Sequence, residues 1–477
     1  MRTKGDTASA PPRRLPPRRA AAIQGAGRLA VAAVPAAAFV LAFSAGSWQE
    51  RGIVAAGQAV IWAVSVRLAQ TLGGAALTAL GPRVAVGRGV LLAAIVATAA
   101  SVWLPHGHDT ANATLLVAPV VFVAGAAWET FALRHVAPAV RLLLVGTGGP
   151  AVDTLLADIR RGRAGGYELI GTVTEPDSAG VGDPQVPVLG CVDELDRVIA
   201  AYRPDLVVLA PGVKPRQTFA RLLDAAEAGF RVVEFAEFYE YAFGRVPIED
   251  LPHEWFMSVL HLYRRPYSRF AKRSIDVAGA LLLIVLTLPL FPLLALLVRV
   301  TKGPVILRQD RLGEHGKLFT IYKFRTMRVD AERPGKAVWA GADDPRVTLV
   351  GAHMRRLRLD ELPQLWNVLR GEMSLVGPRP ERPEFLEELS RNVPNWTRRH
   401  LVKPGLTGWA QVRQGYAASA EATSVKLSYD LWYLRHRSLT VDLAILLRTT
   451  FVVLRGDGSA AARPATPAPA AMAQPYD

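Results

Sequence analysis

The sequence predicts a mixed protein, with a membrane-embedded helical part followed by two α/β parts. Four apolar stretches, each long enough to cross a bilayer, occupy the first third of the chain. From Arg141 onward the pattern changes to alternating strand-like and helix-like segments. A fifth apolar run, Val277–Val298, is followed by dense polar residues among short strand-like pieces. We therefore expect four N-terminal transmembrane helices, a Rossmann-like parallel-sheet domain, and a C-terminal α/β domain with a re-entrant membrane helix.

These features divide the chain into five parts. We expect a disordered basic tail at 1–25, the membrane region at 26–134, the Rossmann-like domain at 135–262, the C-terminal domain at 263–458 with its re-entrant helix at 274–300, and a disordered Ala- and Pro-rich tail at 459–477.

The bulk composition agrees with a partly membrane-embedded chain. Apolar residues make up 51% of the 477 residues, and the mean hydropathy is +0.20. The net charge of +15 indicates a phosphate-rich partner. Because basic residues such as Lys272 and Arg273 lie beside apolar runs, anionic lipid and a phosphorylated substrate are favoured over nucleic acid. Cys191 is the only cysteine in the sequence, which excludes intrachain disulfides and fits a reducing cytoplasm.

Loop charges predict how the first part crosses the membrane. The N-terminal tail and the second loop carry basic residues, whereas the first and third loops are nearly free of them. The positive-inside rule then places the N-terminus and everything after Arg134 in the cytoplasm. The alternative is four buried helices of a soluble bundle. The predicted spans lie near 27–46, 52–71, 85–104 and 113–133.

The second part reads as strand–turn–helix units, which predicts an open parallel sheet covered by helices. Gly146, Gly148 and Ala151 fit the G-x-G-x-x-A pattern of a dinucleotide-binding turn. Glu175 follows the second strand at a longer spacing than this fingerprint has, so a tight turn without a ligand is the alternative we favour. Strands are expected from 141 and near 168–173, 205–211 and 231–237, with helices near 192–202 and 215–229.

The apolar run Val277–Val298 is predicted to enter the membrane and return. Pro289 and Pro292 lie in its middle, where each removes a backbone hydrogen bond. Both flanks are strongly basic, which favours retention of both ends on the cytoplasmic side. A helix bent at Pro289 is therefore expected instead of a fifth straight span.

An adjacent acid pair marks the polar region beyond Gly303. Asp360 and Glu361 follow three arginines, Arg355, Arg356 and Arg358. Carboxylates hold hard cations and guanidiniums clamp phosphates, so this arrangement suits chemistry with Mg²⁺ and phosphate. From these residues alone, the alternative is an acid pair at a helix N-terminus beside a solvated basic face.

A series of motifs extends over the C-terminal domain. In order, these are KRSID (272–276), GPV…QDRLG (303–313), YKFRTM (322–327), DPR (344–346), LDELPQLWNVLRGEMSLVGPRP (359–380) and KPGLTGWAQV (403–412). The series resembles the bacterial sugar transferase family, the polyprenyl-phosphate phosphoglycosyl transferases. With the preceding helices and Rossmann-like domain, the chain is similar to the long-chain branch, the undecaprenyl-phosphate glucose or galactose phosphotransferases of exopolysaccharide biosynthesis.

The resemblance implies an enzyme of the bacterial inner membrane that transfers a sugar 1-phosphate from a UDP-sugar to undecaprenyl phosphate and so initiates exopolysaccharide, capsule or O-antigen synthesis. Asp360 is expected to attack the β-phosphorus, expel UMP and form an aspartyl-phosphosugar intermediate. Glu361 is expected to help it hold Mg²⁺, the implied cofactor. Pro289 is expected to shape the re-entrant helix. The candidate substrate-binding residues are Lys323, Arg325, Arg346, Arg358, Pro378, Arg379 and Pro380.

The expected partners are the UDP-sugar, undecaprenyl phosphate and the bilayer, with a homodimer and other polysaccharide-assembly proteins as further options. One alternative function is an NAD-dependent sugar-nucleotide epimerase or oxidoreductase built on the turn at Gly146 and Gly148. Tyr202 and Tyr239, however, have no Lys at the Tyr-x-x-x-Lys spacing of such enzymes. A non-catalytic polysaccharide-assembly scaffold is the other alternative, and it leaves the Asp360–Glu361 pair unexplained. The motifs do not distinguish glucose, galactose and N-acetylated sugars.

Overall fold

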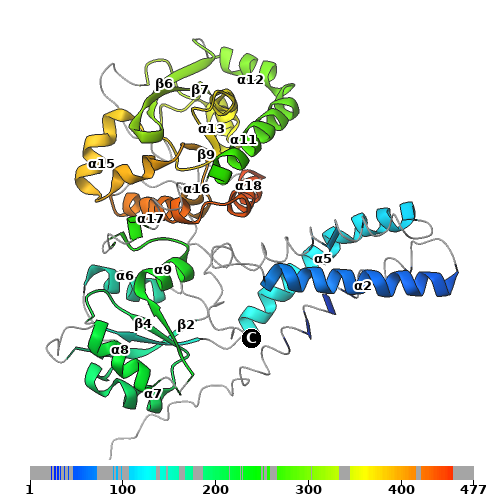
Figure 1. Ribbon diagram of the computed structural model, residues 1–477. Coiled ribbons are helices and arrows are strands. Elements are labelled where there is room, and N and C mark those ends of the chain that lie inside the picture. The colour runs from blue at the N-terminus through cyan, green and yellow to red at the C-terminus, as the bar shows by residue number, and fades with distance from the viewer. Residues whose placement is uncertain are drawn as a thin grey trace, which may run out of the picture.

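The computed structural model describes two long helices of the N-terminal third and most of the chain beyond residue 140 (Figure 1). The two predicted tails and the predicted spans near 27–46 and 85–104 lie almost wholly outside the described residues, as do Gly148, Arg264 and Arg265. The described residues are 47–71, 107–135, 140–146, 149–160, 167–175, 186–213, 215–225, 227, 229–248, 251, 255–257, 266–301, 303–331, 344–414 and 420–454, with scattered residues between 23 and 98.

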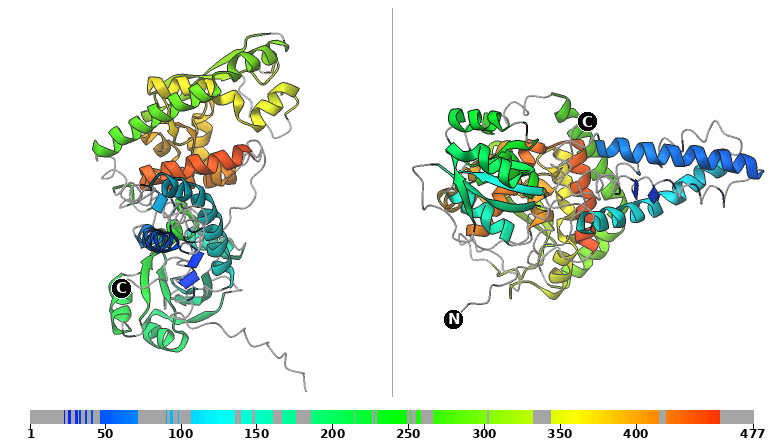
Figure 2. Two further views of the ribbon diagram at one scale, coloured as in Figure 1. Left: turned by 90° about the vertical axis from the view of Figure 1, so that its right-hand side faces the viewer. Right: turned by 90° about the horizontal axis from the view of Figure 1, so that it is seen from below.

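Two N-terminal helices, α2 (Trp48–Thr71) and α5 (Gly107–His135), cover the second and fourth predicted spans and run alongside each other (Figure 2). Trp62 packs with Val117 and Val121 between them, while many outward-facing apolar side chains are exposed. Among the described residues, no single helix combines the length and apolar character needed to cross a bilayer. The four spans therefore stay a prediction.

The second part is an open parallel sheet, as predicted, with the strand order β3-β2-β1-β4-β5. Leu142 and Leu144 of the central strand pack on one face with α6 and α9, whereas Leu143 and Val145 pack on the other face with α7 and α8. The strands are β1 (Val140–Val145), β2 (Tyr167–Thr174), β3 (Val188–Cys191), β4 (Leu206–Leu209) and β5 (Arg231–Glu234). The helices are α6 (Pro150–Arg160), α7 (Leu195–Tyr202), α8 (Pro215–Asp224) and α9 (Phe235–Phe243).

One predicted element of this sheet was too long. The strand expected to reach residue 237 ends at Glu234, and α9 begins at Phe235. Phe235, Phe238 and Tyr239 recur at helical spacing and are all buried, so the helix buries more apolar surface than a continued strand would. The edge strand β3 was not predicted, because its four residues carry little alternation.

The Gly-rich turn after β1 has a structural reason for its first glycine. Gly146 adopts φ 98°, in the left-handed region that favours glycine. A Cβ atom at this position would lie 2.5 Å from Cγ2 of Val213. Both observations explain why a glycine is needed in this tight turn, whether or not it binds a ligand.

The C-terminal domain begins with a bent helix pair. Helices α11 (Pro266–Thr287) and α12 (Leu290–Arg299) meet at Leu288 and Pro289 at an angle of 67°. The predicted break at Pro289 is confirmed, and the pair together, unlike either helix alone, is apolar enough for a broken span or a re-entrant loop. Its return to the cytoplasmic side stays a prediction.

Small sheets and short helices complete this domain. An antiparallel hairpin joins β6 (Ile306–Leu312) and β7 (Leu318–Phe324), and a parallel pair joins β8 (Ser374–Val376) and β9 (Gly405–Thr407). The remaining segments include α13 (Leu349–Arg356), η6 (Leu359–Gln364), α14 (Leu365–Arg370), α15 (Leu386–Asn392), η8 (Trp396–Leu401), α16 (Trp409–Arg413), α17 (Ala420–His436) and α18 (Leu439–Leu454).

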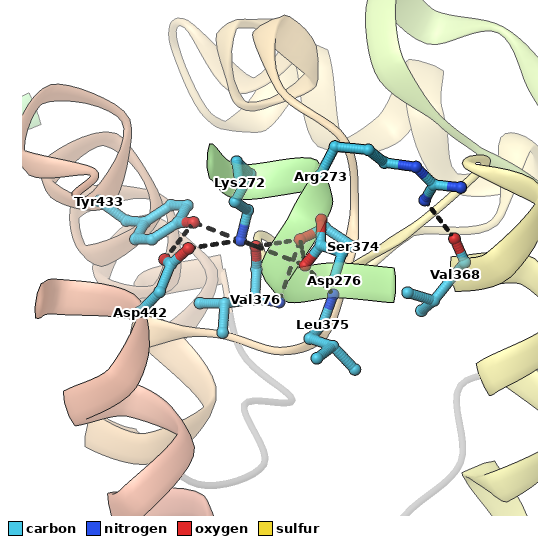
Figure 3. Close-up of polar contacts among 9 residues, drawn as sticks. All are labelled: Lys272, Arg273, Asp276, Val368, Ser374, Leu375, Val376, Tyr433 and Asp442. Atoms are coloured by element: carbon cyan, nitrogen blue, oxygen red, sulfur yellow. Dashed lines mark hydrogen bonds and ion pairs between the residues drawn. The ribbon is translucent and has the colours of Figure 1, made fainter. Parts of the chain in front are cut away.

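Lys272 anchors the bent helix pair to the domain (Figure 3). Its ammonium donates to the carbonyl of Val376 at 2.9 Å and to Oδ2 of Asp442 on α18 at 2.6 Å. The hydroxyl of Tyr433 donates to the other oxygen of Asp442 at 2.8 Å. Lys272, one of the basic residues cited above as favouring anionic lipid, therefore neutralises a buried carboxylate within the protein.

Arg273 and Asp276 continue the same anchor. Arg273 donates to the carbonyls of Val368 and Leu369 at the end of α14, both at 2.6 Å. Oδ1 of Asp276 accepts from the hydroxyl of Ser374 at 2.9 Å and from a backbone N–H of β8. The KRSID motif thus fixes α11 to β8, to α18 and to α14, the helix that directly follows the acid-bearing η6.

From Val246 onward, the segment after α9 packs into the C-terminal domain, whereas Arg245 pairs with Asp158 of α6 in the sheet domain. Val246, Ile248 and Trp255 belong to the same core as Trp396 and Trp409. Figure 1 shows α9 next to α17, at the junction of the two domains. The end of the Rossmann-like part is therefore joined to the C-terminal domain by shared core.

Candidate active site

Asp360 and Glu361 lie on η6, a short 3₁₀ segment that follows α13. The chain reverses just before them at Arg358, whose φ of 53° is left-handed and uncommon for a residue with a side chain. Such conformations persist where surrounding contacts enforce them, often at functional sites. Both carboxylates are buried, at 8% and 7% exposure.

Asn367 holds this acid-bearing segment against β7. Its amide donates to the carbonyl of Thr320 at 2.8 Å and to the carboxylate of Glu372 at 2.7 Å. Its own oxygen accepts from the backbone N–H of Tyr322 at 3.3 Å. Because Asn367 is fully buried, these bonds fix η6 beside the strand that carries Lys323.

Glu361 is engaged by two arginines. Nη2 of Arg379 lies 2.7 Å from one carboxylate oxygen, and Nη1 of Arg358 lies 3.7 Å from the other. Burial alone would raise the pKa of Glu361, but the charges of Arg379 and Arg358 outweigh it and hold that pKa below its usual value. Glu361 is therefore an ionised anchor for both guanidiniums.

Asp360 differs from its neighbour. In the described part of the chain, its carboxylate has no hydrogen-bond or ion-pair partner. Burial, and then the charge of Glu361, raise the pKa of Asp360, while the charges of Lys323, Arg355 and Arg379 oppose that rise. The site thus presents one unengaged carboxylate in a cationic environment.

Lys323 supplies a cation near this carboxylate. Burial, and then the nearby charge of Arg311, lower the pKa of Lys323 to about 8, whereas Asp360 acts to raise it. Among the described residues, its ammonium has no hydrogen-bond partner. Lys323 is therefore charged at neutral pH and available to a phosphate.

The Gly377–Glu381 turn carries Arg379 and depends on close backbone contact. Gly377 donates to the carbonyl of Thr407 at 2.9 Å, and Gly405 donates to the carbonyl of Pro378 at 2.9 Å. A Cβ atom on Gly405 would lie 2.0 Å from the Gly377 nitrogen, and one on Gly408 would lie 2.1 Å from the Gly377 oxygen. These glycines let the turn press onto the strand β9, which fixes its position.

A buried charge cluster supports the turn from behind. Arg399 pairs with Asp430 at 2.7 Å and with Glu381 at 3.5 Å, and it donates to the carbonyl of Arg379 at 2.9 Å. Lys426 makes a close ion pair with Glu381. Burial would raise the pKa of Glu381, but Lys426 and Arg399 lower it to about 2. The backbone of Arg379 is thus held by a buried cluster in which two cations and two carboxylates neutralise one another.

The remaining predicted substrate-binding residues have structural partners. Arg325 is buried and donates to the carbonyls of Pro304 and Val298 and to the hydroxyl of Thr301, so it fastens the end of α12. Arg346 makes a forked ion pair with Asp344, the shorter arm at 2.5 Å.

The prolines around Arg379 form its frame. Pro378 and Pro380 are both buried, and the Pro380 carbonyl accepts from Arg311 at 3.1 Å. Arg356, from the predicted arginine cluster, is exposed on α13. The structure thus gathers Lys323, Arg358 and Arg379 around the two acids, and gives Arg325 an anchoring role at the end of α12.

Three residues of the site were not predicted. Gln411 accepts from Arg358, Arg311 lies against the Pro380 carbonyl, and Arg399 supports the Arg379 backbone. Gln411 and Arg311 lie inside the GWAQV and QDRLG motifs, so the motifs themselves were the available signal. Arg399 lies in no quoted motif.

The donor set fits a divalent cation that completes its coordination elsewhere. No group of three or more His, Cys, Asp or Glu side chains lies together within the described ranges. Mg²⁺ is commonly held by one or two carboxylates plus substrate phosphates and water. Asp360, being unengaged, and Glu361 beside it match that pattern better than an all-protein metal cage.

Comparison with known proteins covers this same region. Residues 267–456 match the model of the bacterial sugar transferase family. The chain is 41% identical over 239 residues to the UDP-N-acetylgalactosamine-undecaprenyl-phosphate N-acetylgalactosaminephosphotransferase of Aeromonas hydrophila, covering 50% of this chain and 56% of the relative. It is 41% identical over 199 residues to the UDP-glucose:undecaprenyl-phosphate glucose-1-phosphate transferase of Escherichia coli (strain K12), covering 40% and 43%.

A shorter relative is matched almost completely. The chain is 42% identical over 188 residues to the uncharacterized sugar transferase EpsL of Bacillus subtilis (strain 168), covering 39% of this chain and 89% of that protein. The match to the two longer relatives spans about half of their length.

Proposed function

Because the chain belongs to the bacterial sugar transferase family, we propose that its C-terminal domain transfers a sugar 1-phosphate from a UDP-sugar to undecaprenyl phosphate and releases UMP. One observation carries the proposal: Asp360 is a buried carboxylate without a partner in the described structure, set among cations that suit a diphosphate. The names of the relatives support the same class of donor and acceptor.

The first half-reaction begins at Asp360. Its carboxylate oxygen attacks the β-phosphorus of the UDP-sugar, the bond from that phosphorus to the bridging oxygen breaks, and UMP leaves with the electron pair. The product is an aspartyl-phosphosugar. A covalent step of this kind divides a transfer between two poorly reactive phosphates into two easier displacements.

The second half-reaction restores the carboxylate. A phosphate oxygen of undecaprenyl phosphate attacks the same phosphorus, and the acyl-phosphate bond to Asp360 breaks. The product is undecaprenyl-diphosphate-sugar, the starting unit of an exopolysaccharide, capsule or O-antigen polymer. Both displacements develop negative charge on phosphoryl oxygens, which fixed cations stabilise.

The cations around the acids have separate tasks in this scheme. Arg379 and Arg358, held by Glu361, present forked donors toward phosphoryl oxygens. Lys323 adds a point charge that follows the transferred group. Mg²⁺, held by Asp360 and Glu361 together with the donor, would neutralise charge on the diphosphate.

The bent helix pair supports a membrane position for the site. Many side chains of α11 and α12 are apolar and exposed, such as Val285 at 69% and Leu296 at 63%. We propose that this surface lies in the inner leaflet of the bacterial inner membrane, with the N-terminal helices crossing four times and both α/β parts in the cytoplasm. Asp360 would then meet a soluble donor and a lipid acceptor at headgroup level.

A panel assay tests the proposal and identifies the sugar. Membranes containing the protein are incubated with undecaprenyl phosphate, Mg²⁺ and one of several radiolabelled UDP-sugars, and UMP and lipid-linked label are measured. UMP release coupled to lipid labelling by one donor is expected, and chelation of Mg²⁺ should abolish it. Oxidation or epimerisation of the donor would favour the oxidoreductase alternative, and inertness toward every donor would favour the scaffold.

A further inference from the structure

The two arginines that hold Glu361 share a second acceptor, Gln411. Its Oε1 accepts from Nη1 of Arg358 at 2.6 Å and from Nη1 of Arg379 at 3.5 Å. Two guanidinium donors on one atom identify that atom as the oxygen of the amide. Gln411, Arg358, Glu361 and Arg379 therefore form a closed ring of polar contacts.

The ring solves an electrostatic problem. Arg358 and Arg379 carry like charges and pair with the same carboxylate. The positive charge of Arg379 therefore repels that of Arg358 and disfavours its close approach. Glu361 provides one anion for two cations, and the amide oxygen of Gln411 provides a second, neutral acceptor between them. Without that acceptor, mutual repulsion would move the weaker-held Arg358, whose distance to Glu361 is 3.7 Å.

Gln411 is held by a helix too short to be stable alone. Helix α16 has five residues, Trp409–Arg413, so tertiary contacts must place it. Its first turn is pressed onto the Gly377–Glu381 turn through Gly408. The ring of Trp409 is buried and stacks on Trp432 of α17 at 4.9 Å.

Trp409 also reaches the preceding domain. Its indole Nε1 donates to the carbonyl of Gly244 at 2.6 Å. Gly244 ends α9 in a left-handed conformation, at the edge of the parallel-sheet domain. Arg435 of α17 forms an ion pair with Glu240 of α9 at 2.6 Å. The end of α9 is therefore fixed against the elements that carry Gln411.

We propose that Gln411 is a positioning residue for the Arg358–Arg379 pair, and that the Trp409–Gly244 hydrogen bond lets the parallel-sheet domain set its place. The inference rests on the proposed function, in which these arginines bind the donor phosphates. It gives the parallel-sheet domain a role in donor binding that needs no ligand of its own.

The first test removes the acceptor and keeps its volume. In the full-length protein, Gln411→Met should raise the KM for the UDP-sugar about 10-fold and change kcat less than about 3-fold, because a binding contact is weakened in ground and transition states alike. Gln414→Met, at the end of the same helix, is the matched control and should leave both constants near wild type. Wild-type KM in Gln411→Met would show that Gln411 only fills space, and would overturn the proposal.

The second test asks whether Trp409 acts through Gln411. Trp409→Phe keeps an aromatic ring and removes the indole N–H that donates a hydrogen bond to the carbonyl of Gly244. It should raise the KM about 3-fold in the wild-type background and have no further effect in Gln411→Met, since residues acting through one network are not additive. Additive effects would remove the parallel-sheet domain from the proposal.

A binding measurement separates this inference from the proposed function. Calorimetry with UMP, the proposed product, needs no turnover, and the dissociation constant should rise about 10-fold in Gln411→Met, in parallel with the KM. Thermal unfolding of each variant confirms that it is folded. UMP binding without turnover in the wild type would refute the proposed function. The inference about Gln411 would then be decided by comparing the UMP dissociation constants of wild type and Gln411→Met. A wild type that neither binds nor releases UMP would overturn both.

Discussion

Nη2 of Arg379 lies 2.7 Å from Oε1 of Glu361, and this ion pair gives the adjacent carboxylates of Asp360 and Glu361 different roles. Glu361 holds the arginine, while Asp360 keeps its oxygens clear of any partner among the described residues. The turn that presents Arg379 rests on the buried Arg399, which pairs with Glu381 at the end of that turn.

Removing the Arg379 guanidinium should strongly impair transfer. Arg379→Ala removes a fork-shaped donor set and frees Glu361, so kcat/KM for UMP release should fall about 100-fold or more. Arg379→Lys should be intermediate, because an ammonium supplies charge without the planar fork. Arg391→Ala, in an exposed pair with Glu387, is the control and should match wild type. Equal activity of Arg379→Ala and the control would contradict the assignment.

Removing the Lys272 ammonium should destabilise the domain. In Lys272→Met the carboxylate of Asp442 stays buried without its cation, which typically costs about 3–5 kcal/mol. Thermal unfolding in detergent should show a lower midpoint, and adding Asp442→Asn should recover part of the loss. Lys317→Met, at an exposed position in the β6–β7 hairpin, serves as control. A lipid-contact role for Lys272 would instead leave the midpoint unchanged.

The junction between the domains should respond to pH through Glu240. Burial raises the pKa of Glu240 to about 7, above the unfolded value of 4.5, although Arg435 opposes the shift. Its contribution to stability is therefore present below pH 4.5 and is lost as the pH rises through 7.

Glu240→Gln removes this contribution from the pH dependence. The unfolding midpoint of Glu240→Gln should accordingly rise more, or fall less, between pH 5 and pH 8 than that of wild type. Burial lowers the pKa of His436, whose Nε2 lies 3.4 Å from Glu240, to about 4, which acts in the opposite sense. Both proteins are therefore compared in a His436→Gln background. Parallel pH profiles for the two proteins would refute the assignment.

Both ends of the bent helix pair should face the cytoplasm. With Cys191 changed to Ser, Ser268→Cys and Lys302→Cys should be labelled from the same side of the membrane by a water-soluble maleimide. Leu288→Cys, at the bend, should resist labelling, because it would lie within the bilayer. Labelling of positions 268 and 302 from opposite sides would establish a straight span instead.

Much of the fold could be predicted because its signals are local. Short apolar runs separated by helical segments identify an open parallel sheet, and a proline in the middle of a long apolar run identifies a bend. The start of α9 was not predicted because RVVEFAE contains residues that favour strands. The segment becomes helical at Phe235 because a helix buries Phe238 and Tyr239 in the core.

The partners of charged residues could not be predicted in the same way. Lys272 stands beside an apolar helix in the sequence, but its partner Asp442 lies 170 residues away. Arg325 and Arg379 are the same residue type in the sequence, yet Arg325 fastens the end of α12 whereas Arg379 pairs with Glu361. Sequence neighbours and motif membership identify which residues matter, whereas long-range contacts decide what each of them does.

The most direct test of the central claim is a single-turnover measurement on Asp360. Wild-type protein mixed with the accepted UDP-sugar, labelled in the sugar and the β-phosphate, but without undecaprenyl phosphate, should release about one UMP per active site and retain the label on the protein. Asp360→Asn should release no UMP and retain no label, while remaining folded by thermal unfolding. Wild-type UMP release by Asp360→Asn, or a wild-type protein that never carries the label, would contradict the account.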